Sequence, residues 1–134
     1  MPLQVSIVTP EEDVLDMQCD EVVVPGVKGD LGLLPDHIPL ISAVQPGVLT
    51  TFAGGKATHY VVSSGFVEID EDRVSILTGT CDKAADIDVA RAQKALDAAQ
   101  AKSDGMSPDD PGYAKAQFKI ARNRARLDGA DRAR

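Results

Sequence analysis

The side chains that most often perform catalysis are few in this sequence, and they are not grouped. The two histidines, His37 and His59, are far apart, and neither has the spacing of a metal-ligand pair. Ser63 is followed by Ser64 and Gly65 but lacks the pattern of a nucleophile elbow, and a turn between strands explains it better. The chain alone is therefore not expected to be an enzyme, and the sequence predicts no metal site and no required cofactor.

The stretch GDLGLLPDHIPLISAVQPG, residues 29–47, combines turn-forming residues with an unusual number of apolar side chains. Its glycines favour turn conformations, and Pro35 and Pro39 prevent regular strand pairing around His37. The leucines and isoleucines are too many for an ordinary loop, so some should enter a core and the rest should form an exposed apolar patch. Such a patch indicates a protein contact, with His37 as a turn or interface residue.

A stripe of basic side chains near the carboxyl end is the other candidate for binding. Lys115, Lys119, Arg122 and Arg126 follow one another at spacings of four, three and four, which places them on one face of a helix. Two interpretations of this stripe remain open. It is either a solvated charged face, as on many exposed helices, or a surface for an acidic partner.

Charge is unevenly distributed along the chain. The 134 residues carry a net charge of −7, of which residues 1–85 contribute −9 and residues 86–134 contribute +2. An acidic body with a basic tail disfavours nucleic-acid binding, which needs one continuous basic face. The sequence predicts no membrane span and no signal peptide, and Cys19 and Cys81 are expected to be buried thiols of a protein in a reducing compartment.

Up to about Thr80 the hydrophobic pattern has the period of two that is typical of strands. Turn signals separate the predicted strands, which cover residues 3–8, 21–25, 47–52, 59–64, 66–70 and 73–78. No helical pattern lies between them. Residues 1–85 are therefore predicted to form a flattened antiparallel β-sandwich or barrel.

After Thr80 the pattern becomes helical. A first helix is expected within residues 86–102, with Asp86 or Asp88 placed to cap its start. A second helix is expected over residues 113–128, ending before Gly129 because glycine costs about 1 kcal/mol inside a helix. Both helices would bury mostly alanine, so the hairpin should be weakly held on the sandwich and able to move.

Four segments occur in an order that is specific in combination: VVVPGVKGDLGLLPDHIPLISAVQPGVL, VVSSGFVEI, VSILTGT and DIDVARA. The first contains the pattern Gly-x-Leu-Gly-x-x-Pro-x-His-x-Pro-Leu, from Gly29 to Leu40. From Leu3 to about Leu127 the chain resembles the epsilon subunits of bacterial and chloroplast F-type ATP synthases, a family that includes the mitochondrial delta subunit. The resemblance implies an amino-terminal flattened antiparallel β-sandwich, residues 1–85, and a carboxy-terminal α-helical hairpin, residues 86–134, that acts as a mobile regulatory arm.

The resemblance implies a non-catalytic rotor subunit in the central stalk of a proton-translocating ATP synthase. Such a subunit binds the gamma subunit and the c-subunit ring, and it transmits rotation of the ring to the catalytic head. The complex would hold the chain peripherally at the cytoplasmic face of a bacterial inner membrane. The residues that would contact the c ring and the neighbouring stalk are Gly29, Leu31, Gly32, Leu33, Leu34, Pro35, His37, Pro39 and Leu40.

In this family the hairpin also acts as a brake on ATP hydrolysis: it is permissive when packed on the sandwich and inhibitory when extended into the head. The resemblance makes Lys115, Lys119, Arg122 and Arg126 the inhibitory face, in contact with the alpha and beta subunits. A helix that stops before Gly129 is short for this task. Strong self-inhibition is therefore not expected.

Residues 87–92, IDVARA, match the motif with which some epsilon subunits bind ATP. The resemblance implies that Arg122 and Arg126 of the second helix hold the phosphates, which suit converging guanidinium groups. It assigns the rest of the site to Ile87, Asp88, Arg91 and Ala92. A further arginine of ATP-binding relatives corresponds to Ala98, and Asp88 and Arg91 have the spacing of an ordinary ion pair at a helix start. ATP is thus expected only as a regulatory ligand.

Three hypotheses follow. The leading one is a coupling subunit of the rotary complex, the second is an ATP-sensing inhibitor of hydrolysis, and the third is a stand-alone ligand-binding or enzymatic β-sandwich. The first two share a fold and differ in what the hairpin does, whereas the third predicts no stable association with stalk subunits.

Overall fold

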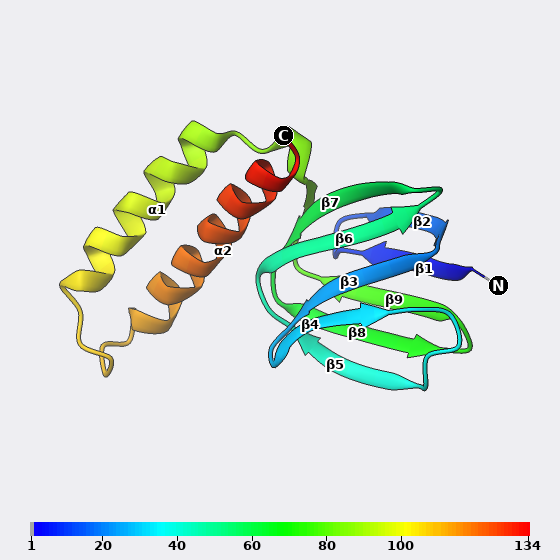
Figure 1. Ribbon diagram of the computed structural model, residues 1–134. Helices are drawn as coiled ribbons and strands as arrows, with labels where there is room; N and C mark the ends of the chain where they lie inside the picture. The colour runs from blue at the N-terminus through cyan, green and yellow to red at the C-terminus, as the bar shows by residue number, and fades with distance from the viewer. Residues whose placement is uncertain (1) are drawn as a thin grey trace.

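The computed structural model describes residues 2–134, which form a β-sandwich followed by a two-helix hairpin (Figure 1). Ten strands are connected in the order β10-β7-β6-β3-β5-β8-β9-β1-β2, with β4 paired to β3. One layer contains β3 (Glu21–Gly26), β4 (Gly29–Leu33), β6 (Gly47–Ala53), β7 (Lys56–Val62) and β10 (Cys81–Lys83). The other contains β1 (Leu3–Val8), β2 (Asp13–Cys19), β5 (Leu40–Val44), β8 (Gly65–Asp70) and β9 (Arg73–Thr78). The predicted fold class is confirmed.

The six predicted strands are present because alternating apolar residues bury one face of each strand. In β8 and β9 the inward residues Val67, Ile69, Val74 and Ile76 are buried in the core between the layers. One detail of the prediction is wrong: the pairing is not wholly antiparallel, since β1 and β9 run parallel, with Val5 opposite Val74. Alternation within a strand does not report which neighbour the strand pairs with.

Four strands, β2, β4, β5 and β10, were not among those predicted. β2, β4 and β5 have irregular burial along their length, and β10 is only three residues long, so their sequences lack clear alternation. The turn between β7 and β8 falls at Ser63 and Ser64, as expected. There the amide of Thr80 donates to Ser63 Oγ at 2.9 Å, so this hydroxyl belongs to the turn.

The helices form the expected antiparallel hairpin. After a short 3-10 turn (Ala84–Asp86), α1 (Val89–Asp104) is capped by Asp88, whose carboxylate accepts a hydrogen bond from the Arg91 amide at 3.0 Å. This bond selects Asp88 as the cap. The side chains that pack between α1 and α2 (Tyr113–Arg132) are Leu96, Ala99, Ile120 and Leu127.

The predicted end of the second helix is wrong, because α2 continues through Gly129 to Arg132. Gly129 is buried against the outer face of β6 and β7, and a Cβ atom at this position would lie 2.5 Å from Val61 Cγ2. The glycine therefore allows the helix and the sheet to approach closely. Packing of Ala125 with Val61 and Ala84 on the same face offsets the low helix propensity of glycine.

Of the two cysteines expected to be buried, Cys19 is buried, whereas Cys81, at the start of β10, is only half-buried. Burial, and to a smaller extent the nearby Asp82, raise the pKa of Cys81 from 9.0 to about 12. Between pH 9 and 12 the folded protein thus keeps this thiol protonated, whereas the unfolded chain would ionise it. We expect the free energy of unfolding contributed by Cys81 to be intact below pH 9 and to be lost between pH 9 and 12.

The comparison that checks this expectation is the pH dependence of urea unfolding for the wild type and for Cys81→Ser. Other groups, including Tyr60, also titrate at alkaline pH, so only the difference between the two proteins reports on Cys81. The wild type should lose stability more steeply than the variant above pH 9. Parallel curves over this range would show that the Cys81 thiol contributes nothing.

Candidate functional site

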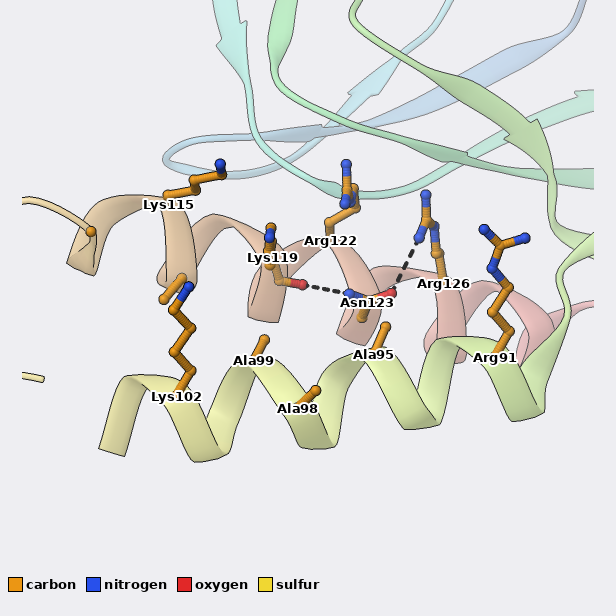
Figure 2. Close-up of a pocket in the computed structure, with 12 residues that line it drawn as sticks. Arg91, Ala95, Ala98, Ala99, Lys102, Lys115, Lys119, Arg122, Asn123 and Arg126 are labelled. Atoms are coloured by element: carbon orange, nitrogen blue, oxygen red, sulfur yellow. Dashed lines mark hydrogen bonds between the residues drawn. The ribbon is translucent and has the colours of Figure 1, made fainter. Parts of the chain in front are cut away.

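A basic groove of about 410 Å³ runs between α1 and α2 (Figure 2). The α2 side supplies Lys115, Lys119, Arg122 and Arg126, the four residues of the predicted stripe. They line this groove, Lys115 is exposed and the last three are half-buried, so both interpretations of the stripe, a solvated face and a binding surface, stay predictions. The remaining lining residues are Arg91, Ala95, Ala98, Ala99, Lys102, Gly112, Ala116 and Asn123.

The structure brings together the residues that the resemblance assigned to ATP. A second, smaller pocket beside the first is lined by Ile87, Asp88 and Ala92, and the two pockets share Arg91 and Arg126. Ala98, which stands where ATP-binding relatives have another arginine, does line the basic groove. A guanidinium group is therefore missing at a position from which it would reach the groove.

The cations of the groove repel one another. Burial is the main cause that lowers the pKa of Arg126, and the neighbouring Arg122 and Arg91 lower it further, although Asp82 acts in the opposite direction. Arg126 donates to Asn123 Oδ1 at 3.2 Å, a neutral partner. A bound anion would relieve this repulsion and supply the charge-assisted hydrogen bonds that guanidinium groups favour.

Arg122 is held in place by its neighbours on α2. Its guanidinium lies over the ring of Phe118, 5.7 Å from the ring centre, while its Nε is buried without a hydrogen-bond partner. An unsatisfied buried donor is costly, and a ligand or bound water with an acceptor atom would remove that cost. The ion pair considered for Asp88 and Arg91 is absent from residues 2–134, where Asp88 instead caps the helix backbone.

The loop from Leu34 to Pro39 connects β4 to β5 and forms one end of the sandwich (Figure 1). It is anchored at Asp36, whose amide donates to Asp72 Oδ1 at 2.7 Å and whose φ is 68°, in the left-handed region. His37 closes the turn with its amide bound to the Leu34 carbonyl, and its Nδ1 lies 2.7 Å from the Ile38 carbonyl oxygen. These contacts fit a turn residue.

The apolar residues of this region divide between core and surface, as predicted. Leu31 and Leu40 pack partly against the core, whereas Ile38 is 75% exposed and Leu34 is 53% exposed. Leu33 is fully buried, so its expected role as a contact residue is wrong. Its side chain points inward from β4 into the core and is not available to a partner.

A second apolar surface, which the sequence analysis missed, covers part of the outer face of β5, β8 and β9. Ala43 pairs with Phe66, Phe66 with Leu77, and Leu77 with Val8, so these residues form a row across four strands. Phe66 is 61% exposed and Leu77 is 55% exposed. We call this surface the outer apolar patch; it consists of Val8, Ile41, Ala43, Phe66 and Leu77.

The signal for this patch was present in the strand pattern. In FVEID and RVSILT the inward positions are Val67, Ile69, Val74 and Ile76, which leaves Phe66 and Leu77 pointing outward. Once the strand pairing is known, these two large apolar side chains are seen to be neighbours on the outward face of the sheet. Such a pair indicates a surface that contacts another protein.

For residues 2–134, a metal site and a membrane-spanning helix are two further features that bear on function. These residues contain no cluster of three or more histidine, cysteine or acidic side chains that could hold a metal ion. Neither described helix combines the length and hydropathy required of a membrane-spanning segment.

Comparisons with known proteins agree with these features. Residues 2–84 match the family model of the β-sandwich domain of the ATP synthase delta/epsilon chain, and residues 85–131 match that of its long α-helix domain. ATP synthase epsilon chains of Anaeromyxobacter dehalogenans and Myxococcus xanthus are 41% and 39% identical. Each alignment covers 98% of this chain, and they cover 100% and 97% of those relatives.

A solved structure of similar fold occurs in the Euglena gracilis mitochondrial ATP synthase. It has a TM-score of 0.84 and 26% identity, and the match covers 96% of this chain and 81% of that one. The fold also occurs in the central stalk and c-ring structure of the Tetrahymena thermophila mitochondrial enzyme, with a TM-score of 0.64. With both family models matched and relatives aligned over nearly their full length, the chain belongs to the ATP synthase delta/epsilon chain family.

Proposed function

We propose that this chain is a non-catalytic subunit of the central stalk of a proton-translocating F-type ATP synthase, where it couples rotation of the c ring to the catalytic head. The outer apolar patch is the observation that carries this proposal. A row in which exposed Phe66 and Leu77 lie between half-buried Ala43 and Val8, on a rigid sheet, needs a protein partner to remove it from water. Family membership makes a stalk subunit that partner.

Two surfaces at different places on one rigid body suit a part that transmits torque. We assign the outer apolar patch to the gamma subunit and the loop that carries Leu34 and Ile38 to the c ring. Ile41, at 71% exposure, is the second residue after the loop, on β5, the strand that also carries Ala43 of the patch. The sandwich core joins both surfaces through paired strands, so that a force applied at the loop reaches the patch without an intervening hinge.

The absence of catalysis is part of the proposal and has local support. Ser63 Oγ bonds within its turn, His59 Nδ1 lies 2.8 Å from Thr50 Oγ1, and His37 bonds the backbone of its own loop. None of these groups forms a nucleophile and base pair with another. The chain would reach the cytoplasmic face of a bacterial inner membrane only through the assembled complex.

Co-purification tests the proposal. The full chain is mixed with the gamma subunit and with a c ring solubilised in detergent. The three should elute together as one species on size-exclusion chromatography. A chain that elutes alone, at the volume of the free protein, would reject the assignment and favour a stand-alone β-sandwich.

A second candidate function, regulation by ATP, is favoured by the basic groove and the adjoining pocket. Arg91, Arg122 and Arg126 converge there, and the pocket lined by Ile87, Asp88 and Ala92 lies next to them. Triphosphate in the groove and adenine in the pocket would bridge α1 and α2, and the nucleotide would hold the hairpin in its packed form. The missing cation at Ala98 makes the expected affinity weak.

The test is ATP binding by the full chain, measured by calorimetry. Arg126→Gln should weaken binding about tenfold or more, because charge-assisted hydrogen bonds are worth about 1.5–3 kcal/mol each. Lys94→Gln removes the same charge from an exposed position outside both pockets and should leave ATP binding nearly unchanged. Equal losses in the two variants would reject a specific nucleotide site.

A further inference from the structure

We propose that the basic groove binds linear polyphosphate chains longer than a nucleotide triphosphate, because its cationic lining continues past the arginines to a second anion subsite. We call this the distal subsite; it consists of Lys102, Lys115 and Lys119. The inference rests on the proposed anion-binding role of the groove and extends it, since the distal subsite has no part in the nucleotide site described above.

The groove is long. Arg91 and Lys102 both line it and are eleven residues apart on α1, which corresponds to about 16 Å along the helix axis. On α2, Lys115 and Arg126 are also eleven residues apart. Because the helices are antiparallel, Arg91 and Arg126 share one end and Lys102 and Lys115 share the other (Figure 2). Three linked phosphates held by the arginines occupy one end of this length only.

The charge of the lining is of one sign throughout. Six cations line the groove, and its lining contains no carboxylate. The ion pairs found in residues 2–134 are Arg132 with Asp128 and Arg134 with Asp131, both outside the groove. A ligand that carries charge at regular intervals along its length would therefore neutralise both ends, which a compact anion cannot do.

The direction in which such a chain extends is set by the neighbouring pocket. Asp82, Asp86 and Asp88 line the pocket beyond Arg91 and balance the charges of Lys83, Arg91 and Arg126 there, so this pocket attracts an anion less than the wholly cationic groove does. At the opposite end the groove is lined by Lys102, Lys115 and Gly112. A polyphosphate longer than three units would consequently extend from the arginines toward the distal subsite.

The floor of the groove favours polyphosphate over an acidic peptide. It is made of small alanines, among them Ala95, Ala98 and Ala116, which offer methyl groups and no hydrogen-bonding side chains. Asn123 is already engaged: its Nδ2 donates to the Lys119 carbonyl and its Oδ1 accepts from Arg126. The backbone amides of a peptide on this floor would lose water without gaining partners, whereas a phosphate chain has only anionic oxygens to satisfy.

Calorimetry on the full chain, at one fixed ionic strength, tests this with tripolyphosphate, ATP and a longer linear polyphosphate of defined length. We expect the longer chain to bind about tenfold more tightly than tripolyphosphate, when affinity is expressed per binding site. Equal affinity per site for the two chains would overturn the proposal. So would stronger binding of an oligoglutamate peptide than of the longer polyphosphate.

A double variant separates the distal subsite from general attraction by charge. Lys102→Gln with Lys115→Gln should reduce binding of the longer chain to the tripolyphosphate level and leave tripolyphosphate binding nearly unchanged. Lys94→Gln with Arg124→Gln removes the same charge from exposed positions outside the groove and should preserve the preference for length. Equal loss of the preference in both double variants would overturn the distal subsite.

The outcomes for ATP and polyphosphate are distinguishable. Polyphosphate binding that depends on Lys102 and Lys115, without measurable ATP binding, would reject the nucleotide sensor and support this inference. ATP binding that depends on Arg126, with no gain from a longer chain, would support the sensor and reject the inference. The coupling role is tested separately, by co-purification.

Discussion

Phe66→Asp is expected to weaken binding of the chain to the gamma subunit by about a hundredfold or more, which is roughly 2.7 kcal/mol. Phe66 occupies the middle of the outer apolar patch, between Ala43 and Leu77 on the neighbouring strands. Central aromatic residues commonly contribute 2 kcal/mol or more to an interface. Aspartate would remove this contact and also place a charge against an apolar partner surface, where it loses water without gaining a counter-ion.

The measurement is the co-purification assay, followed by a titration of the gamma subunit. Because Phe66 is 61% exposed, the substitution should leave the melting temperature of the isolated chain nearly unchanged. Val89→Asp is the matched control, since Val89 is an apolar residue 45% exposed at the first position of α1, where an acid suits the helix dipole. If Phe66→Asp binds gamma as tightly as Val89→Asp does, the patch is not the interface.

Gly129→Val is expected to release the hairpin from the sandwich while both parts stay folded. A Cβ at position 129 would lie 2.5 Å from Val61 Cγ2 and 3.4 Å from Ala84 Cβ, and Val61 is buried and stiff at χ1. Overpacking of this kind costs about 1–3 kcal/mol. Valine recovers only a few tenths of a kcal/mol in helix propensity over glycine, so the clash decides the sign.

Hydrogen exchange measures this release. Amides near Val61 in β7 should lose about tenfold or more in protection in Gly129→Val, whereas those of the core strand β1 should not. Ala121→Val introduces the same side chain on an exposed part of α2 and should leave the protection of Val61 unchanged. Unchanged protection in Gly129→Val would show that the sheet accommodates the larger residue.

A compensating pair makes the steric cause testable. Gly129→Ala alone places a methyl group against Val61, and Gly129→Ala with Val61→Ala removes the methyl groups that it meets. The double variant should restore docking relative to the single one. If the hairpin is a brake that acts in its extended form, ATP hydrolysis by the reconstituted complex should fall with Gly129→Val and with Gly129→Ala, and it should recover from the Gly129→Ala level in the pair Gly129→Ala with Val61→Ala.

The strands of the sandwich core could be read from the sequence because their pattern is local. Val67, Ile69, Val74 and Ile76 alternate with residues of the opposite face, and burial of one face depends only on this alternation. The strands β2, β4, β5 and β10 could not be read in this way. Their places depend on the partners that they find across the sheet, which include β3 for β4 and β8 for β5.

The candidate site was predictable to the extent that it lies on one helix. The spacing of Lys115, Lys119, Arg122 and Arg126 determines that they share a face, since helical geometry alone sets that relation. That Arg91 and Lys102 complete the groove from α1 depends on how the two helices pack. The register of that packing is set by contacts such as Leu96 with Ile120, and no local pattern encodes it.

By itself the sequence determined the sandwich, the hairpin, the basic face and the family, because each depends on local periodicity or on a specific run of residues such as Gly29 to Leu40. Only the tertiary structure decided which leucine of that run is core and which is surface. It also revealed the apolar row across β5, β8, β9 and β1. It extended α2 through Gly129, because the contact with Val61 outweighs the intrinsic preference of glycine, and that contact exists only when a helix and a sheet from different parts of the chain meet.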